Sequence, residues 1–333
     1  MRKAGGASAR TDDLLTPNNI GTTRVKGLMR YLYTTLGKLR ADQLGMILPH
    51  EHVFVDLRTP DQPGYGEAER DSVLALMVPQ IEAIQALGVT ALVECSTGGV
   101  GRRADLDLAV SQATGLPIVV PTGIYREPWI PAWVYAASEG ELERWMHAEL
   151  VAGIEDTGFQ AGWIKLSAGD DGITPLEGRI LRAASRAGSQ TGALIGSHTI
   201  RGRVVMDQLD IIEAEGGSAA RFVSIHTQAE PDFGLHQAVA ARGAWIEYDN
   251  IGAVPLEESV ELIMRAIDAG LAAQLLISHD RGWYDPALPG GGVPKPYTVV
   301  NTELIPQLQA RGVAEAMLTQ LFQHNPFAAF SRP

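Results

Sequence analysis

The sequence contains very little cysteine. Cys95 is the single cysteine among the 333 residues, which excludes an internal disulfide and a metal cluster held by several thiolates. A chain without disulfides suits a reducing compartment, so we expect a cytoplasmic location. Membrane and export signals are absent too. No apolar run approaches the roughly 18 residues of a membrane span, and the first residues, MRKAGGASARTDDLLTPNN, lack the apolar core of a secretory signal.

Positive charge is also in short supply. The chain has 27 basic and 39 acidic residues, for a formal net charge of −12. This balance argues against nucleic acid and against anionic membranes as partners, because both carry dense negative charge. The balance says little about small-molecule substrates, because local fields decide how those bind.

Short β-branched apolar runs alternate with amphipathic segments from residue 46 onward. The candidate strands are residues 46–55, 89–96, 117–125, 162–168, 193–199, 221–227, 244–250 and 274–280. Successive runs are about 33 residues apart, the length of one βα unit, and eight such units predict an α/β fold, the (β/α)8 TIM barrel. The competing fold, an open doubly wound sheet, is expected to carry a phosphate-binding loop, but neither GxGxxG nor GxxxxGK[ST] occurs.

One of the segments between these strands carries a clear signal for the start of a helix. Thr174 is a candidate N-cap, Pro175 suits the first helical position, and Glu177 completes a capping box. The tail from residue 298 onward predicts two closing helices. We divide the chain into a short N-terminal extension, residues 1–34, and one barrel domain, residues 35–333.

The stretch LPHEHVFVDL places two histidines one residue apart in an apolar run. Alternate residues of a strand point to the same face, so His50 and His52 project together and Glu51 projects to the other face. Two converging imidazoles can hold a metal ion. The alternative is a pair of core histidines that are hydrogen-bonded to the backbone.

Other candidate strands also end in polar residues. The full set at strand ends is His50, His52, Lys165, His198, His226 and Asp280. The carboxyl ends of barrel strands meet at one rim, and four histidines with an aspartate suit zinc or a similar divalent ion. Lys165 does not fit a cation site as an ammonium ion. It is either exposed or paired with Asp170 or Asp171, or it loses its proton and adds carbon dioxide to become a carbamate.

These residues, in this order and at these strand ends, resemble the phosphotriesterase-like branch of the amidohydrolase superfamily. The matching text is HEH at 50–52, WIKLSAG, SHT, IHT and SHD, with TGIY and NPFAAF as further similarities. The resemblance implies a (β/α)8 metal-dependent hydrolase with two divalent ions, and also a homodimer. It assigns one ion to His50, His52 and Asp280 and the other to His198 and His226. Carboxylated Lys165 and a hydroxide would bridge the two ions.

The resemblance also implies an activity. The bridging hydroxide would attack a carboxylic ester, which we expect to be a lactone, with weak organophosphate triesterase activity in addition. Asp280 would accept the hydroxide proton and pass it to the leaving alkoxide. Zinc is the expected metal, and manganese, cobalt or iron would suit the same ligands. The alternatives are a dedicated phosphotriesterase, a mononuclear deaminase and a non-catalytic metal-binding scaffold.

The residues that would contact the substrate are less clearly marked. In lactonase members a tyrosine near the position of Tyr125 contacts the substrate carbonyl, while the alternative is that Tyr125 only packs against a helix. Arg281 and Tyr284 follow the last strand, and Arg281 either clamps an anionic substrate group or pairs with Asp285 or Glu247. The residue before Asp280, His279, is expected to point away from the site.

Overall fold

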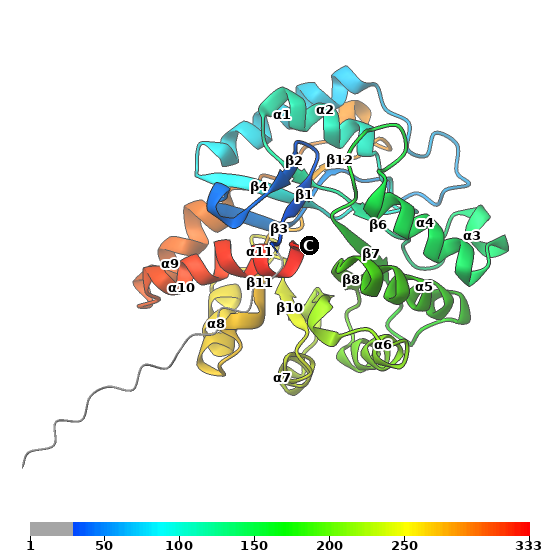
Figure 1. Cartoon of the computed structure of the whole chain (residues 1–333). Helices are drawn as coiled ribbons and strands as arrows, with labels where there is room; N and C mark the ends of the chain where they lie inside the picture. The colour runs from blue at the N-terminus through cyan, green and yellow to red at the C-terminus, as the bar shows by residue number, and fades with distance from the viewer. Residues whose placement is uncertain (1–28) are drawn as a thin grey trace, which may run out of the picture.

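Eight parallel strands, each followed by helical segments, form the centre of the molecule (Figure 1). The computed structural model describes residues 29–333. The strands of the ring are β3 (Met46–Phe54), β4 (Val89–Glu94), β5 (Ile118–Val119) with β6 (Pro121–Thr122), β7 (Trp163–Ser167), β8 (Ile195–His198), β9 (Phe222–Ile225), β10 (Trp245–Tyr248) and β11 (Leu275–Ile277). Each of the eight candidate strands predicted from the sequence contains one of these, the third as the short pair β5 and β6.

The ring closes between the last strand and the first. The backbone N–H of Asp280 donates to the carbonyl of His50 at 3.1 Å, and the backbone N–H of His50 donates to Ser278 Oγ at 3.1 Å. Beyond this point β12 (Gly282–Tyr284) runs parallel to the end of β3. The predicted (β/α)8 barrel is therefore confirmed.

Helices surround the strands (Figure 1). They are α1 (Arg70–Gln85), α2 (Ala104–Thr114), α3 (Ala132–Ala136), α4 (Glu139–Val151), α5 (Pro175–Thr191), α6 (Gly202–Ala214), α7 (Phe233–Ala241) and α8 (Leu256–Asp268). Helix α5 begins at the predicted capping box. The hydroxyl of Thr174 accepts from the Glu177 N–H at 3.2 Å, and the Glu177 carboxylate accepts from the Thr174 N–H at 2.9 Å. The box satisfies two donors that would otherwise be orphaned.

The chain ends in two helical segments, as predicted. The first passes through a π-helical turn, Val300–Leu304, into α9 (Ile305–Ala310), and the second runs from α10 (Glu315–Thr319) through another π turn into α11 (Asn325–Phe330). Each π turn lies directly before a segment with proline in its first turn. Proline has no N–H and its ring collides with a carbonyl of the preceding turn, so a wider turn relieves both problems.

The amino-terminal end of the barrel is closed by residues from both ends of the described chain. A hairpin of β1 (Leu32–Thr34) and β2 (Gly37–Leu39) lies there, and Tyr31 and Arg332 exchange backbone hydrogen bonds of 2.8 and 3.0 Å. Phe330 packs edge-on against Trp163 inside the ring, with ring centroids 5.1 Å apart. Of the expected extension, residues 1–34, the last three form β1, and residues 1–28 lie outside the described part.

No helix between residues 29 and 333 combines the length and the apolar composition that crossing a membrane requires.

Candidate metal centre

A cavity of about 120 Å³ lies where the strands of the barrel end. The residues that line it are His50, His52, Val55, Leu57, Cys95, Val100, Tyr125, Lys165, His198, His226, Asp280 and Trp283. All six side chains that the sequence placed at strand ends are among them. They come from β3, β7 and β8 and from the residues directly after β9 and β11, so the barrel gathers side chains that are up to 230 positions apart, from His50 to Asp280.

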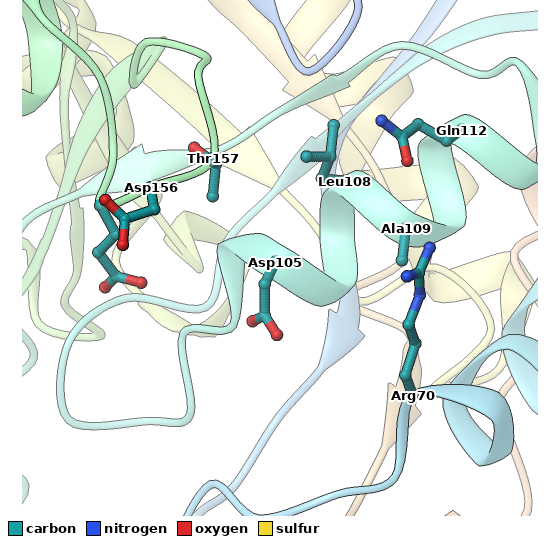
Figure 2. Close-up of a pocket in the computed structure, with 8 residues that line it drawn as sticks. Arg70, Asp105, Leu108, Ala109, Gln112, Asp156 and Thr157 are labelled. Atoms are coloured by element: carbon teal, nitrogen blue, oxygen red, sulfur yellow. The ribbon is translucent and has the colours of Figure 1, made fainter.

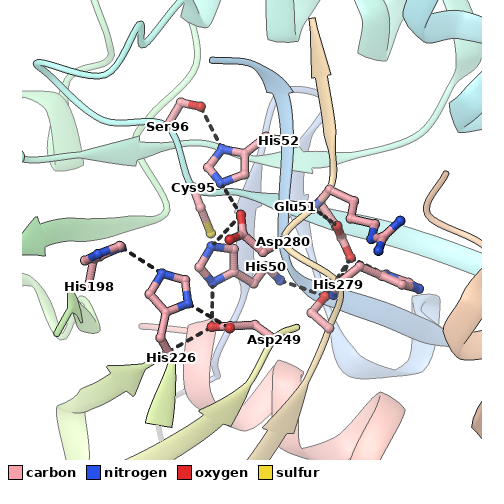
Figure 3. A network of polar contacts seen from close by, with 12 residues as sticks. His50, Glu51, His52, Cys95, Ser96, His198, His226, Asp249, His279 and Asp280 are labelled. Carbon is pink, nitrogen blue, oxygen red and sulfur yellow. Dashed lines mark hydrogen bonds and ion pairs between the residues drawn. The ribbon is translucent and has the colours of Figure 1, made fainter. Parts of the chain in front are cut away.

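His50 and His52 project together from β3, and each ring has one nitrogen already engaged (Figure 3). His50 Nδ1 lies 2.9 Å from the Glu247 carboxylate. His52 Nδ1 lies 2.8 Å from Ser96 Oγ, whose own proton goes to a backbone carbonyl of β3, so the hydroxyl accepts from the ring. Both Nδ1 atoms therefore donate to these acceptors, and both Nε2 atoms point into the cavity. These face Asp280 Oδ1, at 3.0 Å from His52 and 3.7 Å from His50.

His198 and His226 form the other half of the cavity wall. His226 Nε2 and His198 Nδ1 are 2.7 Å apart, while His226 Nδ1 contacts the buried Asp249 carboxylate at 2.7 Å (Figure 3). Asp249 therefore holds a hydrogen on Nδ1 of His226, and Nε2 is the nitrogen that faces His198. Burial holds the pKa of His198 well below its ordinary value, so this ring is neutral.

Lys165 is 2% exposed and reaches the cavity from β7. Among residues 29–333 no carboxylate oxygen lies within 4.0 Å of its Nζ, which also excludes the expected pairs with Asp170 and Asp171. The chain at Gly123, which has φ of +115°, packs directly against the Lys165 backbone. This close approach is possible because glycine has no Cβ, for which there is no room here. A buried ammonium ion without a counter-charge is costly, so the surroundings of Lys165 do not explain it as a structural ion pair.

Two of the six residues have left-handed backbone conformations that side chains other than glycine rarely adopt. His226 has φ of 63° and Asp280 has φ of 55°. Each follows the end of its strand, and the sharp turn swings the side chain back over the mouth of the barrel. Such conformations cost of order 1 kcal/mol or more and persist at functional sites where the surroundings enforce them.

The carboxylate of Asp280 is held in its ionised form. Burial alone would favour the neutral acid, but the hydrogen bond from His52 and the charges of the surrounding histidines hold the pKa of Asp280 well below its ordinary value. His50, His52 and Asp280 each offer one ligand atom, and these three atoms lie within 4.8 Å of one another. The arrangement is that of a site for a divalent cation with nitrogen and oxygen ligands.

Comparison with protein families agrees with this geometry. The model of the phosphotriesterase family matches residues 30–330, nearly the whole chain. The chain belongs to the phosphotriesterase family. It is accordingly a metal-dependent hydrolase of the phosphotriesterase and lactonase type, with histidine and aspartate groups able to bind metal.

Individual members of the phosphotriesterase family match over most of their length. A phosphotriesterase homology protein of Mycobacterium tuberculosis is 32% identical, covering 91% of this chain and 98% of the relative. An aryldialkylphosphatase of Saccharolobus solfataricus is 26% identical, covering 88% and 97%. The crystal structure of a mutant lactonase from Deinococcus radiodurans, described as phosphotriesterase-like, superposes with a TM-score of 0.80 at 30% identity, covering 90% of this chain and 99% of that one.

Two acidic residues that contact the histidines of the cavity were not predicted from the sequence. Glu247 and Asp249, at the end of β10, are both at most 1% exposed and hold the Nδ1 atoms of His50 and His226. The signal was present, because WIEYDN ends in two acidic residues at alternate positions of an apolar run. Cys95 also lines the cavity and was seen only as an isolated cysteine.

Tyr125 forms part of the cavity wall. Its ring lines the cavity and packs edge-on against His198, with ring centroids 5.2 Å apart. Burial raises the pKa of Tyr125 to about 12, so the phenol keeps its proton and can donate a hydrogen bond.

Arg281 and Tyr284 do not line this cavity. The guanidinium of Arg281 donates to the carbonyl of Gly252 instead of pairing with a carboxylate. Tyr284 is 6% exposed and stacks on Phe54, with ring centroids 5.7 Å apart, so its ring belongs to the core and the expected substrate contact does not fit. Its neighbour Trp283 occupies the cavity wall, 5.8 Å from the His52 ring centroid.

The opposite face of β3 serves the structure, as the alternation predicts. Glu51 is fully buried and accepts hydrogen bonds from Ser278 Oγ at 2.8 Å, from the backbone N–H of His279 at 3.1 Å and from that of Arg281 at 2.9 Å (Figure 3). The His279 ring points away from the cavity and contacts Glu51 through Nδ1 at 2.5 Å. This network ties the first strand to the chain after the last.

A larger hollow of about 360 Å³ lies on the outside of the barrel, beside α2 and the loop after α4 (Figure 2). Its lining residues are Arg70, Asp105, Leu108, Ala109, Gln112, Glu155, Asp156 and Thr157. These offer no histidine or nucleophilic cysteine, and they lie away from the strand ends. The smaller cavity is therefore the candidate active site, since it gathers the chemically competent side chains.

Proposed function

We propose that the protein is a binuclear hydrolase of carboxylic esters, with a lactone as the expected substrate and weak organophosphate triesterase activity in addition. One observation carries the proposal. Six side chains able to bind metal, from five separate strands of the ring, line one cavity. A dedicated phosphotriesterase is the second candidate, since one relative is named an aryldialkylphosphatase.

The residues fit a pair of divalent ions. His50, His52 and Asp280 would hold one, and His198 and His226 the other, because each histidine has its second nitrogen engaged or its ring kept neutral. Lys165 as a carbamate would bridge them, which removes the unpaired buried charge. Two such ions supply a water of lowered pKa and a Lewis acid for the substrate oxygen.

The chain's own residues then handle the proton and the substrate. Asp280 is ionised and its side chain is 28% exposed at the mouth, so it can accept a proton from the attacking water and return it to the leaving alkoxide. Tyr125 can donate its phenolic hydrogen to the substrate oxygen. A cavity of about 120 Å³ favours a compact ring such as a lactone over a bulky triester. The lactonase from Deinococcus radiodurans, which aligns at a TM-score of 0.80, supports the same choice.

The test is a comparison of kcat/KM for a lactone panel and for paraoxon-type triesters, on protein of measured metal content. Higher values for lactones support the proposal, while higher values for triesters favour the second candidate. If metal-loaded protein hydrolyses no lactone, no triester and no generic aryl ester, the remaining alternative is a non-catalytic metal-binding scaffold. One ion per chain instead of two would contradict the binuclear centre and favour a mononuclear enzyme.

Two variants test the assigned roles. Asp280→Asn should retain most of the metal but lose several orders of magnitude in kcat, while the control Asp285→Asn on the same loop should keep both its metal and its kcat. Lys165→Ala should lose metal and activity, and bicarbonate with a short-chain acid should partly restore both, whereas Lys38→Ala should behave as wild type. Lys165→Ala protein with a full metal complement and no additive would contradict the carbamate.

A homodimer forms a separate part of the proposal. Trp133 and Tyr135, on and beside α3, are 47% and 50% exposed, and large exposed aromatic side chains are typical of interfaces. Light scattering coupled to gel filtration measures the mass. A Trp133→Glu variant should shift a dimer to the monomer, and a monomeric wild type would contradict the proposal.

A further inference from the structure

Arg126 stands on the rim beside the candidate active site. It follows Tyr125, and its guanidinium lies against that phenol and over the ring of Trp129, with 5.7 Å from Cζ to the ring centroid. Tyr125 packs edge-on against both Trp129 and His198, with ring centroids 5.6 and 5.2 Å apart. Arg126 therefore lies beside the part of the cavity wall that His198 forms.

This guanidinium has no counter-charge of its own. Among the described residues no carboxylate oxygen lies within 4.0 Å of it, and its Nε is buried without a hydrogen-bond partner. Two other cations near the rim are already engaged. Arg281 donates to the carbonyl of Gly252, and Lys295 lies over the ring of Trp283 at 3.7 Å.

A buried donor without a partner is destabilising, and more so when it is charged, unless a ligand satisfies it. A planar guanidinium presents paired donors that match the two oxygens of a carboxylate, and it also binds sulfonate and phosphate. Because Tyr125 both touches Arg126 and lines the cavity, an anion bound at Arg126 would lie one side chain away from the reacting ester.

We propose that Arg126 binds an anionic group carried by the substrate, so that the preferred substrates are esters or lactones with a carboxylate or another oxyanion away from the scissile bond. This inference rests on the proposed ester hydrolase function and narrows its substrate class. It moves the anion-binding role from Arg281, where the sequence suggested it, to Arg126, whose buried Nε has no hydrogen-bond partner.

Matched pairs of lactones and aryl esters test the inference, each pair differing only in a neutral or anionic distal group. Carboxylate, sulfonate and phosphate versions separate the oxyanion types. Charge-assisted pairing predicts that Arg126→Met lowers kcat/KM for the anionic members about 10- to 100-fold, mainly through KM, and leaves the neutral members within about threefold. Arg126→Lys should recover part of the loss. Arg203→Met, an exposed arginine on α6, removes the same charge and should change neither series.

Equal losses for neutral and anionic members in Arg126→Met would overturn the inference and assign Arg126 to positioning Tyr125. If no ester or lactone is hydrolysed, the proposed function fails, and binding of glutarate to the metal-loaded protein then decides the inference by calorimetry. Binding that weakens at least tenfold in Arg126→Met, but not in Arg203→Met, supports it. Equal glutarate affinity in wild type and Arg126→Met overturns it.

Discussion

Replacing Glu51 should lower the free energy of unfolding by weakening the junction between the first and last strands of the barrel. The side chains that line the cavity are not changed. The Glu51 carboxylate accepts from the Ser278 hydroxyl, from the backbone N–H groups of His279 and Arg281, and from the His279 ring. In Glu51→Ala these donors lose their acceptor in a fully buried place. Each unsatisfied buried donor costs about 1–3 kcal/mol, and partial relaxation and water entry reduce the sum, so we expect a loss of about 3–6 kcal/mol.

Glu51→Gln should cost less, about 1–3 kcal/mol. The amide keeps one oxygen for Ser278 and His279 but directs its NH2 group at the N–H of Arg281. The matched control is Glu258→Ala on α8, where the side chain is exposed and the change should stay within about 0.5 kcal/mol. The free energy of unfolding should therefore decrease in the order wild type, Glu258→Ala, Glu51→Gln and Glu51→Ala.

Urea unfolding followed by circular dichroism measures these values, with the slope compared between variants so that a changed unfolded state is detected. Thermal midpoints should fall in the same order. A Glu51→Ala protein within about 1 kcal/mol of wild type would refute the reasoning, because such a small loss is below the cost of even one buried unsatisfied donor at the middle of its range.

Three further predictions follow from other buried groups. Asp249→Asn removes the charge that orients two histidines and should weaken metal affinity about 10- to 100-fold, as measured by chelator competition. Burial raises the pKa of Tyr125 and of Tyr65 to about 12 from 10.0, so folding stability should be fully present below pH 10 and decline as the pH rises toward 12. Urea midpoints between pH 8 and 11 check this, and a flat profile would contradict it. In Arg102→Met, the Glu149 carboxylate, which is 5% exposed, loses the guanidinium that donates to its two oxygens at 2.5 and 2.8 Å. The free energy of unfolding should fall by about 3–5 kcal/mol, because a buried charge is left unpaired. An Arg102→Met, Glu149→Leu double variant that is no more stable than the single one would contradict the cause.

Much of the fold was readable because strands and helices leave local signals. The run at 46–55 became β3 (Met46–Phe54), and the capping box at Thr174 opened α5 as predicted. The convergence of the six cavity residues followed from strand direction alone, since all parallel strands present their carboxyl ends at one rim. Alternation also placed Glu51 away from the histidines.

The parts that escaped prediction depend on backbone turns and on pairing in space. The chain after β11 passes through left-handed residues at Asp280 and Trp283, so two-residue alternation no longer tells which side chain faces the cavity. For this reason Tyr284, which was expected at the substrate, lies in the core, whereas Trp283 lines the cavity. Glu247 and Asp249 were visible as residues, but only the three-dimensional structure shows which histidine nitrogen each one contacts.

The closure of the ring has a consequence for how the enzyme is made. β3 is synthesised near the start of the described chain, yet its neighbours on one side, Ser278 and Asp280, emerge from the ribosome more than 220 residues later. The nitrogen and oxygen atoms that converge in the cavity therefore do not exist as a set on a nascent chain. Contacts of such long range form slowly, so a complete ligand set has to wait until the segment that contains Asp280 has been synthesised, and earlier fragments expose only part of the set.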